Sequence, residues 1–308
     1  MKLPRFFTSI VITVSLLSSP ALADIKIGVA MSQFDDTWQT YLREAMVNKA
    51  KAMPDGVRLQ FEDARADVIK QISQIEGFIS QGVDAIIVCP VDTAATRKMT
   101  ADATAAGIPL IYVNRQPDDK HLPEGVAIVV SNEREAGQLQ MQYLAEKMNG
   151  AGKVVLLLGD LANNATANRT QGVKEILAKY PGITIEQEQT ATWARDKGMN
   201  LVNDWLTQGR EFDAVVSNND EMAIGAAMAL RQAGVAKGKV LIAGVDGTPD
   251  GLRAVKGGEL SVSVYQDAQG QADGAIDVAV HMVKKEPYEV ARIIPFRLIT
   301  PENVDEFN

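Results

Sequence analysis

Short apolar runs alternate with longer amphipathic stretches along almost the whole of this chain. Short apolar runs bounded by polar turn residues indicate buried β-strands, and stretches with apolar positions every three or four residues indicate helices. Strands that alternate with helices are typical of parallel sheets, because each helix carries the chain back to the start of the next strand. The sequence therefore predicts an α/β fold.

The predicted elements fall into two series. In the first half the strands are expected at 25–30, 58–62, 85–89, 109–113 and 126–130, and the helices at 38–53, 67–80 and 93–106. In the second half the strands are expected at 154–158, 183–188, 214–217, 240–243 and 260–264, and the helices at 168–180, 196–208, 222–233 and 247–256. A final helix over 269–284 precedes a strand around 293–299.

The two halves resemble copies of one unit. Segment 82–87 in the first half parallels 211–216 in the second, and each opens a strand after a helix of similar length. The next helix ends in Ala-Gly in both halves, at 106–107 and 233–234, which is a common way for a helix to stop. Two similar α/β lobes are expected to form a cleft between them.

The crossings between the lobes are expected to be short and hinge-like, because no linker rich in proline, glycine or serine separates the halves. The final helix is expected to return to the first lobe. The predicted crossings are 131–132, 266–267 and 294–295, with 24–131 and 267–293 in the first lobe and 132–266 and 294–308 in the second.

The first 23 residues read as an export signal. Lys2 and Arg5 supply the positive start, 6–17 is the apolar stretch, and Ala21-Leu22-Ala23 is the cleavage site, so the mature chain is expected to begin at Asp24. The apolar stretch is shorter than the roughly 20 residues that span a bilayer. We therefore expect a periplasmic protein that is not inserted in the membrane.

Composition excludes several classes of function. The formal charge is −8, and removal of Lys2 and Arg5 with the signal would make it −10, so an acidic chain without a basic run is not expected to bind nucleic acid. The single Cys89 cannot form an internal disulfide and is expected to be a buried thiol at the end of a strand. His121 and His281 are far apart in sequence and lack ligand spacing, so no metal, cofactor or catalytic triad is expected.

Polar side chains follow two neighbouring strands of the second half. Asn219 comes after the apolar run 214–217, and Asp246 comes after 240–243. Open α/β sheets bind ligands at the carboxyl ends of their strands. Because no nucleophile or metal cluster stands beside these residues, the pattern predicts a protein that binds a small polyol and is not an enzyme.

Other candidate contacts lie at similar positions, and each has a structural alternative. Phe34, Asp35, Asp36 and Trp38 follow the first strand, where capping and core packing compete with ligand contact. The remaining candidates are polar or aromatic residues expected at strand ends, helix starts or crossings: Asn114, Arg115, Arg169, Trp193 and Gln266. Aromatic faces that cover C–H groups, with charged and amide groups for hydroxyls, suit a neutral polyhydroxylated ligand.

The mature chain resembles periplasmic binding proteins of the ribose and galactose type, the soluble components of sugar ABC importers. The most specific blocks are Asn114-Arg115-Gln116, Asn219-Asp220-Glu221-Met222-Ala223 and 245–251. The resemblance implies the type I architecture, two Rossmann-like lobes with parallel sheets joined by three hinge crossings that close on ligand. It also implies a monomer, a membrane permease as partner, and ligand contacts at Asp36, Trp38, Asn114, Arg115, Arg169, Trp193, Asn219, Asp246 and Gln266.

Within this family the chain is similar to the inositol and rhizopine branch. Gln39 stands where ribose binders have a second aromatic, and Asn114 stands where the family usually has Asp, so the resemblance implies a ring other than ribose or galactose. Rhizopine is an O-methylated inosamine and would carry an ammonium that Asp35, Asp36 and Asp246 could neutralise. A neutral inositol, an amino-cyclitol and a neutral monosaccharide remain the alternatives.

Three other functions compete with transport. A regulatory effector domain of the LacI type would share the fold, but the predicted export signal and the lack of a DNA-binding headpiece argue against it. A binder that presents its ligand to a chemotaxis or kinase sensor fits the same sequence. A glycosidase would need two carboxyls that flank the scissile bond, and Asp35 with Asp36 is the pair that could supply them.

Overall fold

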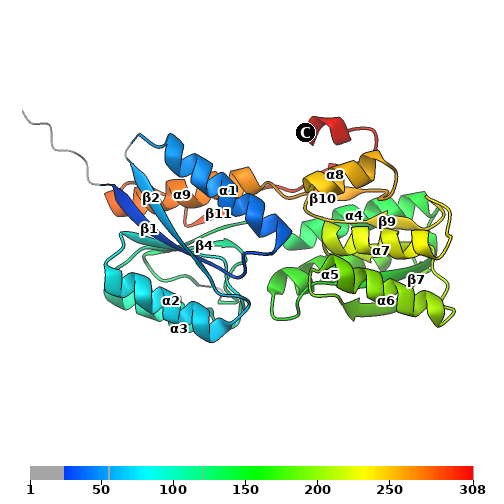
Figure 1. The fold of residues 1–308 in the computed structure, drawn as a ribbon, viewed down its shortest axis with the longest axis horizontal. Helices are drawn as coiled ribbons and strands as arrows, with labels where there is room; N and C mark the ends of the chain where they lie inside the picture. The colour runs from blue at the N-terminus through cyan, green and yellow to red at the C-terminus, as the bar shows by residue number, and fades with distance from the viewer. Residues whose placement is uncertain (1–23, 55, 120, 308) are drawn as a thin grey trace, which may run out of the picture.

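The computed structural model describes residues 24–54, 56–119 and 121–307, so the predicted export signal lies outside the described residues. Two α/β lobes lie side by side, and each has a sheet between layers of helices (Figure 1). No described helix combines the length and the apolar character that a membrane crossing requires. The predicted fold class is confirmed.

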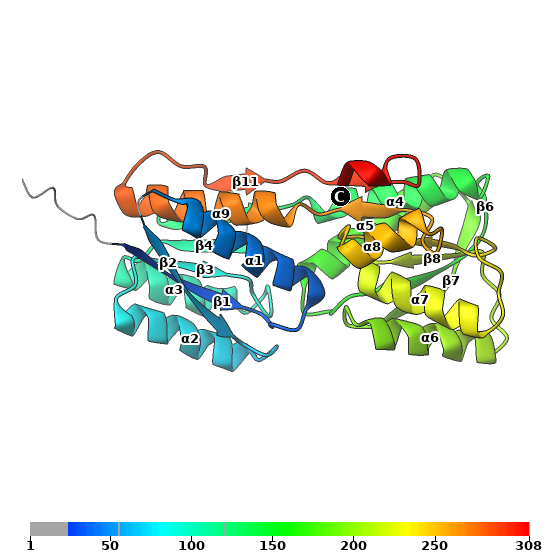
Figure 2. The same ribbon diagram turned by 45° about the horizontal axis from the view of Figure 1, so that its top comes forward.

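The first lobe is built on a six-stranded parallel sheet with the order β11-β5-β4-β3-β1-β2. Its strands are β1 (Ile25–Met31), β2 (Val57–Asp63), β3 (Ala85–Val88), β4 (Leu110–Asn114), β5 (Val126–Val130) and β11 (Ala291–Ile293). Its helices are α1 (Thr37–Ala52), α2 (Val68–Gln81), α3 (Thr96–Ala106) and α9 (Ala268–Lys284). Helices α1 and α9 pack together on one face, and α2 and α3 cover the other (Figure 2).

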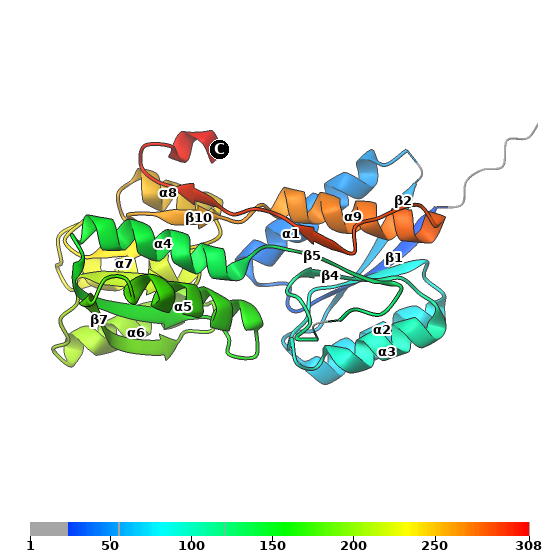
Figure 3. The same ribbon diagram turned by 180° about the vertical axis from the view of Figure 1, so that it is seen from behind.

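The second lobe has a four-stranded parallel sheet with the order β7-β6-β8-β9, next to an antiparallel pair of β10 and β12. Its strands are β6 (Ala151–Leu158), β7 (Gly182–Thr190), β8 (Ala214–Ser217), β9 (Leu241–Ala243), β10 (Ser263–Tyr265) and β12 (Arg297–Ile299). Its helices are α4 (Glu133–Lys147), α5 (Asn164–Leu177), α6 (Arg195–Thr207), α7 (Asp220–Gln232) and α8 (Pro249–Lys256), followed by the 3-10 turn Val304–Phe307. Helix α4 packs on α5, and α6 packs on α7 (Figure 3).

Several helices begin at a side chain that accepts a backbone N–H bond. Asp36 caps α1, Asn163 caps α5 and Asn219 caps α7 in this way. Each of these helices follows the carboxyl end of a parallel strand. The caps therefore place polar side chains at the edge of each sheet that faces the other lobe.

The chain passes between the lobes three times. Strand β5 leads into α4, β10 leads into α9, and β11 leads into β12, which Figures 2 and 3 show as three neighbouring connections. The described chain reaches its last turn on the second lobe, beside α8.

Three predictions of secondary structure differ from the structure. Helix α4 was not predicted, because its sequence is polar and its buried face includes Glu133 and Gln140 rather than a continuous apolar stripe. The strand expected at 260–264 forms at Ser263–Tyr265, so it begins three residues later than expected and ends one residue later. The strand expected around 293–299 is two short strands in different sheets, because residues 294–296 cross between the lobes.

The lobes also touch directly at the mouth of the cleft. The backbone N–H of Thr93 donates to the carbonyl oxygen of Ala162 at 3.2 Å. The side-chain amide of Asn164 donates to the carbonyl oxygen of Gln116 at 2.9 Å and to Oδ1 of Asp118 at 3.1 Å. These contacts join loops that follow β3 and β4 to the loop before α5, so they exist only while the lobes are close together.

Removal of the Asn164 side chain, by Asn164→Ala, should shift the ligand-free protein toward more separated lobes. Two hydrogen bonds between the lobes are lost at about 0.5–1.5 kcal/mol each, which changes the ratio of close to separated lobes by about fivefold or more. The measurement is single-molecule energy transfer between dyes attached at the exposed positions Lys51→Cys and Lys237→Cys, since the native Cys89 is buried. Asn168→Ala, one turn further along α5, is the control, and equal distributions for both variants would contradict the prediction.

Candidate ligand-binding site

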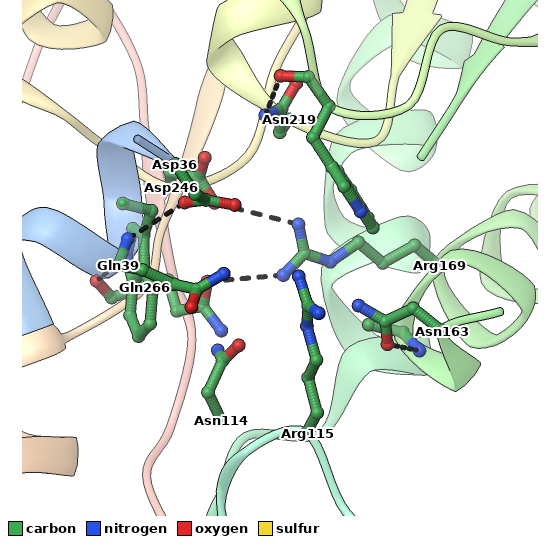
Figure 4. A pocket seen from close by; sticks show the side chains of 12 residues that line it. Asp36, Gln39, Asn114, Arg115, Asn163, Arg169, Asn219, Asp246 and Gln266 are labelled. Carbon is green, nitrogen blue, oxygen red and sulfur yellow. Dashed lines mark hydrogen bonds and ion pairs between the residues drawn. The ribbon is translucent and has the colours of Figure 1, made fainter. Parts of the chain in front are cut away.

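A cavity of about 340 Å³ lies between the lobes and is lined by residues from both (Figure 4). The lining residues are Asp36, Trp38, Gln39, Asn114, Arg115, Asn163, Ala165, Arg169, Trp193, Asn219, Asp246 and Gln266. The structure thus brings together all of the predicted site residues except Phe34 and Asp35.

Phe34 and Asp35 lie outside this lining. The ring of Phe34 packs against the first-lobe core and lies 4.1 Å from the guanidinium of Arg43, and its carbonyl oxygen accepts hydrogen bonds from Thr40 and Arg43. The side chain of Asp35 is exposed. The next residue, Asp36, caps α1 by accepting the N–H of Gln39 at 2.9 Å, and this cap directs Asp36 rather than Asp35 to the cavity.

Three lining residues were not among the predicted site residues. Gln39 is 1% exposed and its Oε1 accepts the hydroxyl proton of Ser32 at 2.9 Å. Asn163 caps α5 by accepting the N–H of Ala165 at 2.9 Å. An asparagine before a helix that follows β6 was the available signal for Asn163. For Gln39 the signal was its position where ribose binders have a second aromatic, and Ala165, an apolar residue inside a helix, gave none.

Arg115 is the cation on the first-lobe side. It is 8% exposed, its Nη1 donates to the carbonyl oxygen of Pro90 at 3.0 Å, and it forms no ion pair with any described residue. Asn114 beside it has a φ of 65°, which turns the chain at the end of β4, and its Oδ1 lies 3.8 Å from the sulfur of Cys89. Burial raises the pKa of the Cys89 thiol, so the group beside Asn114 is a neutral thiol.

Arg169 is the cation on the second-lobe side and is held by several elements. Its Nε donates to Oε2 of Glu133 at 2.5 Å, its Nη1 to the carbonyl oxygen of Asn218 at 2.6 Å, and its Nη2 to Oε1 of Gln266 at 3.2 Å. Both ion-paired side chains are at least nine-tenths buried. The guanidinium is therefore fixed in direction before any ligand arrives (Figure 4).

Asp246 faces Arg169 without a direct hydrogen bond. Its Oδ1 lies 3.7 Å from Nη1 of Arg169, and the side chain is 5% exposed. Burial raises the pKa of Asp246 well above its usual value, and the charge of Arg169 opposes that rise. Because Glu133 is the closer partner of Arg169, the oxygens of Asp246 keep their capacity to accept hydrogen bonds from a ligand.

Trp193 and Asn219 form the far wall of the cavity. The side-chain amide of Asn219 donates to the carbonyl oxygen of Trp193 at 3.1 Å, while its Oδ1 accepts the N–H of Met222 at 3.0 Å as the cap of α7. Trp193 has a φ of 67°, and its ring lies 5.6 Å from the guanidinium of Arg169. The indole is thus an apolar face held by backbone contacts.

Three buried N–H donors among these residues have no hydrogen-bond partner in the described protein: Nε2 of Gln39, Nε of Arg115 and Nε1 of Trp193. Buried polar groups without partners cost free energy, so a ligand that supplies acceptors would gain from meeting them. Asp36 and Asp246 line the same cavity and supply acceptors for the donors of such a ligand.

Within the described residues no group of His, Cys, Asp or Glu side chains could hold a metal ion. The arrangement can bind a compact molecule with several hydroxyl groups.

Comparisons with known proteins give the same class. A model of the periplasmic binding protein domain matches residues 27–287. The chain is 50% identical over 299 residues to the "Putative rhizopine-binding protein" of Rhizobium meliloti, with 96% of each chain covered. It is 36% identical to the xylitol-binding protein of Mycolicibacterium smegmatis, with 85% of this chain and 74% of that protein covered.

Solved structures extend the match to the fold. The chain is similar to an ABC transporter solute-binding protein of Bacillus halodurans with bound myo-inositol, at 40% sequence identity and a TM-score of 0.88. The alignment covers 94% of this chain and 99% of that one.

Removal of the partner of Arg169, Glu133→Ala, should lower the free energy of unfolding of the ligand-free protein by about 3 kcal/mol, because a buried guanidinium loses its closest carboxylate. Chemical denaturation measures this value. Glu135→Ala is the matched control in the same helical turn and should cost less than about 1 kcal/mol. A loss at Glu133 no larger than the loss at Glu135 would show that the ion pair does not stabilise the lobe.

Proposed function

The chain belongs to the periplasmic binding protein family, and from this premise we propose that it captures a cyclitol in the periplasm for an ABC importer. The family and the relatives are solute-binding proteins and not enzymes. The relatives named above bind, by their names or their bound ligands, small molecules rich in hydroxyl groups.

The observation that supports the ligand class is the set of unpaired buried donors on residues that line the cavity. Gln39, Arg115 and Trp193 each present a buried N–H without a protein partner, and Asp36 and Asp246 present carboxylate oxygens nearby. A ring with a hydroxyl on every carbon supplies an acceptor and a donor at each position. The indole faces of Trp38 and Trp193 suit the C–H groups of such a ring.

Capture is proposed to occur by closure of the lobes at their three connections. The first lobe comprises 24–131 and 267–293, and the second comprises 132–266 and 294–308. Asp36, Trp38 and Arg115 on one side and Arg169, Trp193, Asn219 and Asp246 on the other contact the same ligand, so ligand binds the closed form better and shifts the population toward it. A permease in the membrane then binds the closed monomer.

The charges of the cavity favour a second candidate, an amino-cyclitol. Asp36 and Asp246 line the cavity, and Arg169 is already paired with Glu133, which does not line it. The side chain of Asp246 is beyond hydrogen-bond distance of Arg169 and can accept a hydrogen bond from a ligand. An ammonium on the ring would place a positive charge there, and its attraction to the faces of Trp38 or Trp193 would add about 0.5–2 kcal/mol.

A thermal-shift screen of ligand-stripped, refolded protein tests the ligand class. At 100 times its dissociation constant a ligand adds about 2.7 kcal/mol to the free energy of unfolding, which raises the melting temperature measurably. The compounds are myo-inositol, scyllo-inositol, scyllo-inosamine with and without its methyl ether, ribose, galactose and xylitol. The largest shift is expected for cyclitols. A larger shift for the amines would identify an amino-cyclitol binder, and a shift confined to ribose or galactose would contradict the cyclitol proposal.

Loss of the unpaired cation, Arg115→Ala, should weaken binding of the best ligand by about 10- to 100-fold, since a hydrogen bond to a charged group contributes about 1.5–3 kcal/mol. Isothermal titration calorimetry measures the affinity. Arg97→Ala removes an exposed arginine of the same lobe that pairs with Asp119, and it should leave the affinity unchanged. Equal affinity of the two variants would remove Arg115 from the proposed site.

A further inference from the structure

A carboxylate that does not line the cavity lies behind Asp246. Asp220 is the first residue of α7 and is fully buried. Its Oδ2 accepts the backbone N–H of Gly247 at 2.9 Å and that of Thr248 at 3.1 Å, and its Oδ1 accepts the hydroxyl proton of Ser263 at 2.6 Å. One side chain therefore ties α7 to the loop between β9 and α8 and to β10.

Two glycines let the backbone approach this carboxylate closely. A Cβ atom at Gly251 would lie 2.0 Å from Oδ2 of Asp220, and one at Gly244 would lie 2.2 Å from Oδ1. The backbone N–H of Asp220 donates to the carbonyl oxygen of Val245 at 2.7 Å. The loop from Gly244 to Gly251 thus surrounds the side chain of Asp220. At Gly244 and Gly251 the backbone lies so close to this side chain that no residue with a Cβ atom would fit.

The loop holds Asp246 in a conformation that it would seldom adopt alone. Asp246 has a φ of 127°, in a region that residues other than glycine rarely occupy and keep only where the surroundings fix it. Its own N–H donates to the carbonyl oxygen of Val264, and its own carbonyl oxygen accepts the N–H of Gln266. The backbone immediately after it is fixed by Asp220.

We propose that Asp220 is a positioning residue for ligand recognition, which holds the amides of Gly247 and Thr248 so that Asp246 keeps its unusual backbone conformation and directs its carboxylate into the cleft. The proposal rests on the proposed role of Asp246 as a ligand contact. Asp220 acts through Asp246 and does not touch the ligand.

The role depends on hydrogen bonding rather than on charge. Burial raises the pKa of Asp220 to about 7, and its hydrogen bonds oppose that rise while the neighbouring carboxylate of Glu221 adds to it. The other charged groups that interact with Asp220 are Asp246 and Arg169. In the protonated form Oδ2 still accepts both amides and Oδ1 can donate to Ser263. An asparagine could make the same contacts.

The first test compares Asp220→Ala with Asp220→Asn by calorimetric titration with myo-inositol. Asp220→Ala should bind at least about tenfold more weakly, because two buried amides lose their acceptor, whereas Asp220→Asn should stay within about threefold of the wild type. Glu221→Gln is the control: it removes a charge from the same turn of α7, where Glu221 pairs with Arg195, and keeps Asp220 as the acceptor for the amides of Gly247 and Thr248. A folded Asp220→Ala with wild-type affinity would overturn the proposal.

A double-mutant cycle separates positioning from a general loss of stability. In an Asp246→Asn background, which removes the carboxylate that Asp220 is proposed to position, Asp220→Ala should cause little further loss of affinity. If the two losses instead add, then Asp220 affects binding by another route and the proposal fails.

Amide exchange needs no ligand and keeps the test independent of the proposed function. In the ligand-free protein the amides of Gly247 and Thr248 should be protected in the wild type and in Asp220→Asn, and should exchange faster in Asp220→Ala. If Asp220→Ala does not fold, Ser263→Ala takes its place, with faster exchange expected at the same amides; unchanged exchange in the variant that folds would overturn the proposal. A wild type that fails to bind myo-inositol would reject myo-inositol as the ligand, and the exchange data would still decide the role of Asp220.

Discussion

The buried ion pair between Arg169 and Glu133 is the interaction on which the rest of the cleft depends. A guanidinium taken out of water is costly unless it is paired and its N–H groups are satisfied. Here Glu133 comes from the start of α4, just after the first connection between the lobes, Gln266 comes from the second connection, and the carbonyl oxygen of Asn218 comes from the end of β8. The cation can be buried only if these elements meet at one place.

That requirement links the floor of the cleft to the connections around which the lobes are proposed to move. Gln266 also accepts a hydrogen bond at its carbonyl oxygen from the indole of Trp38, so the second connection contacts both walls of the cavity. A ligand that contacts Trp38 and Arg169 therefore acts on side chains that are already joined to the connections. The proposed closure and the proposed ligand recognition therefore involve the same few residues.

The fold could be predicted from the sequence because buried parallel strands leave a clear signal of short apolar runs. Much of the cavity lining could be predicted for a related reason: polar residues such as Asn114, Asn219 and Asp246 stand directly after those runs. Helix α4 could not, because it buries Glu133 and Gln140 and so lacks an apolar stripe. Phe34 and Asp35 were predicted as contacts because they follow the first strand, and the sequence could not show that only Asp36 and Trp38 of this segment line the cavity.

The buried N–H groups of Gln39, Arg115 and Trp193 have no hydrogen-bond partner among the described residues. A buried N–H without a partner costs about 1–3 kcal/mol. Selectivity in such a site has two sources: the hydrogen bonds that the protein already makes fix the positions of its side chains, and the unsatisfied donors favour an occupant that supplies acceptors over an apolar one of the same size.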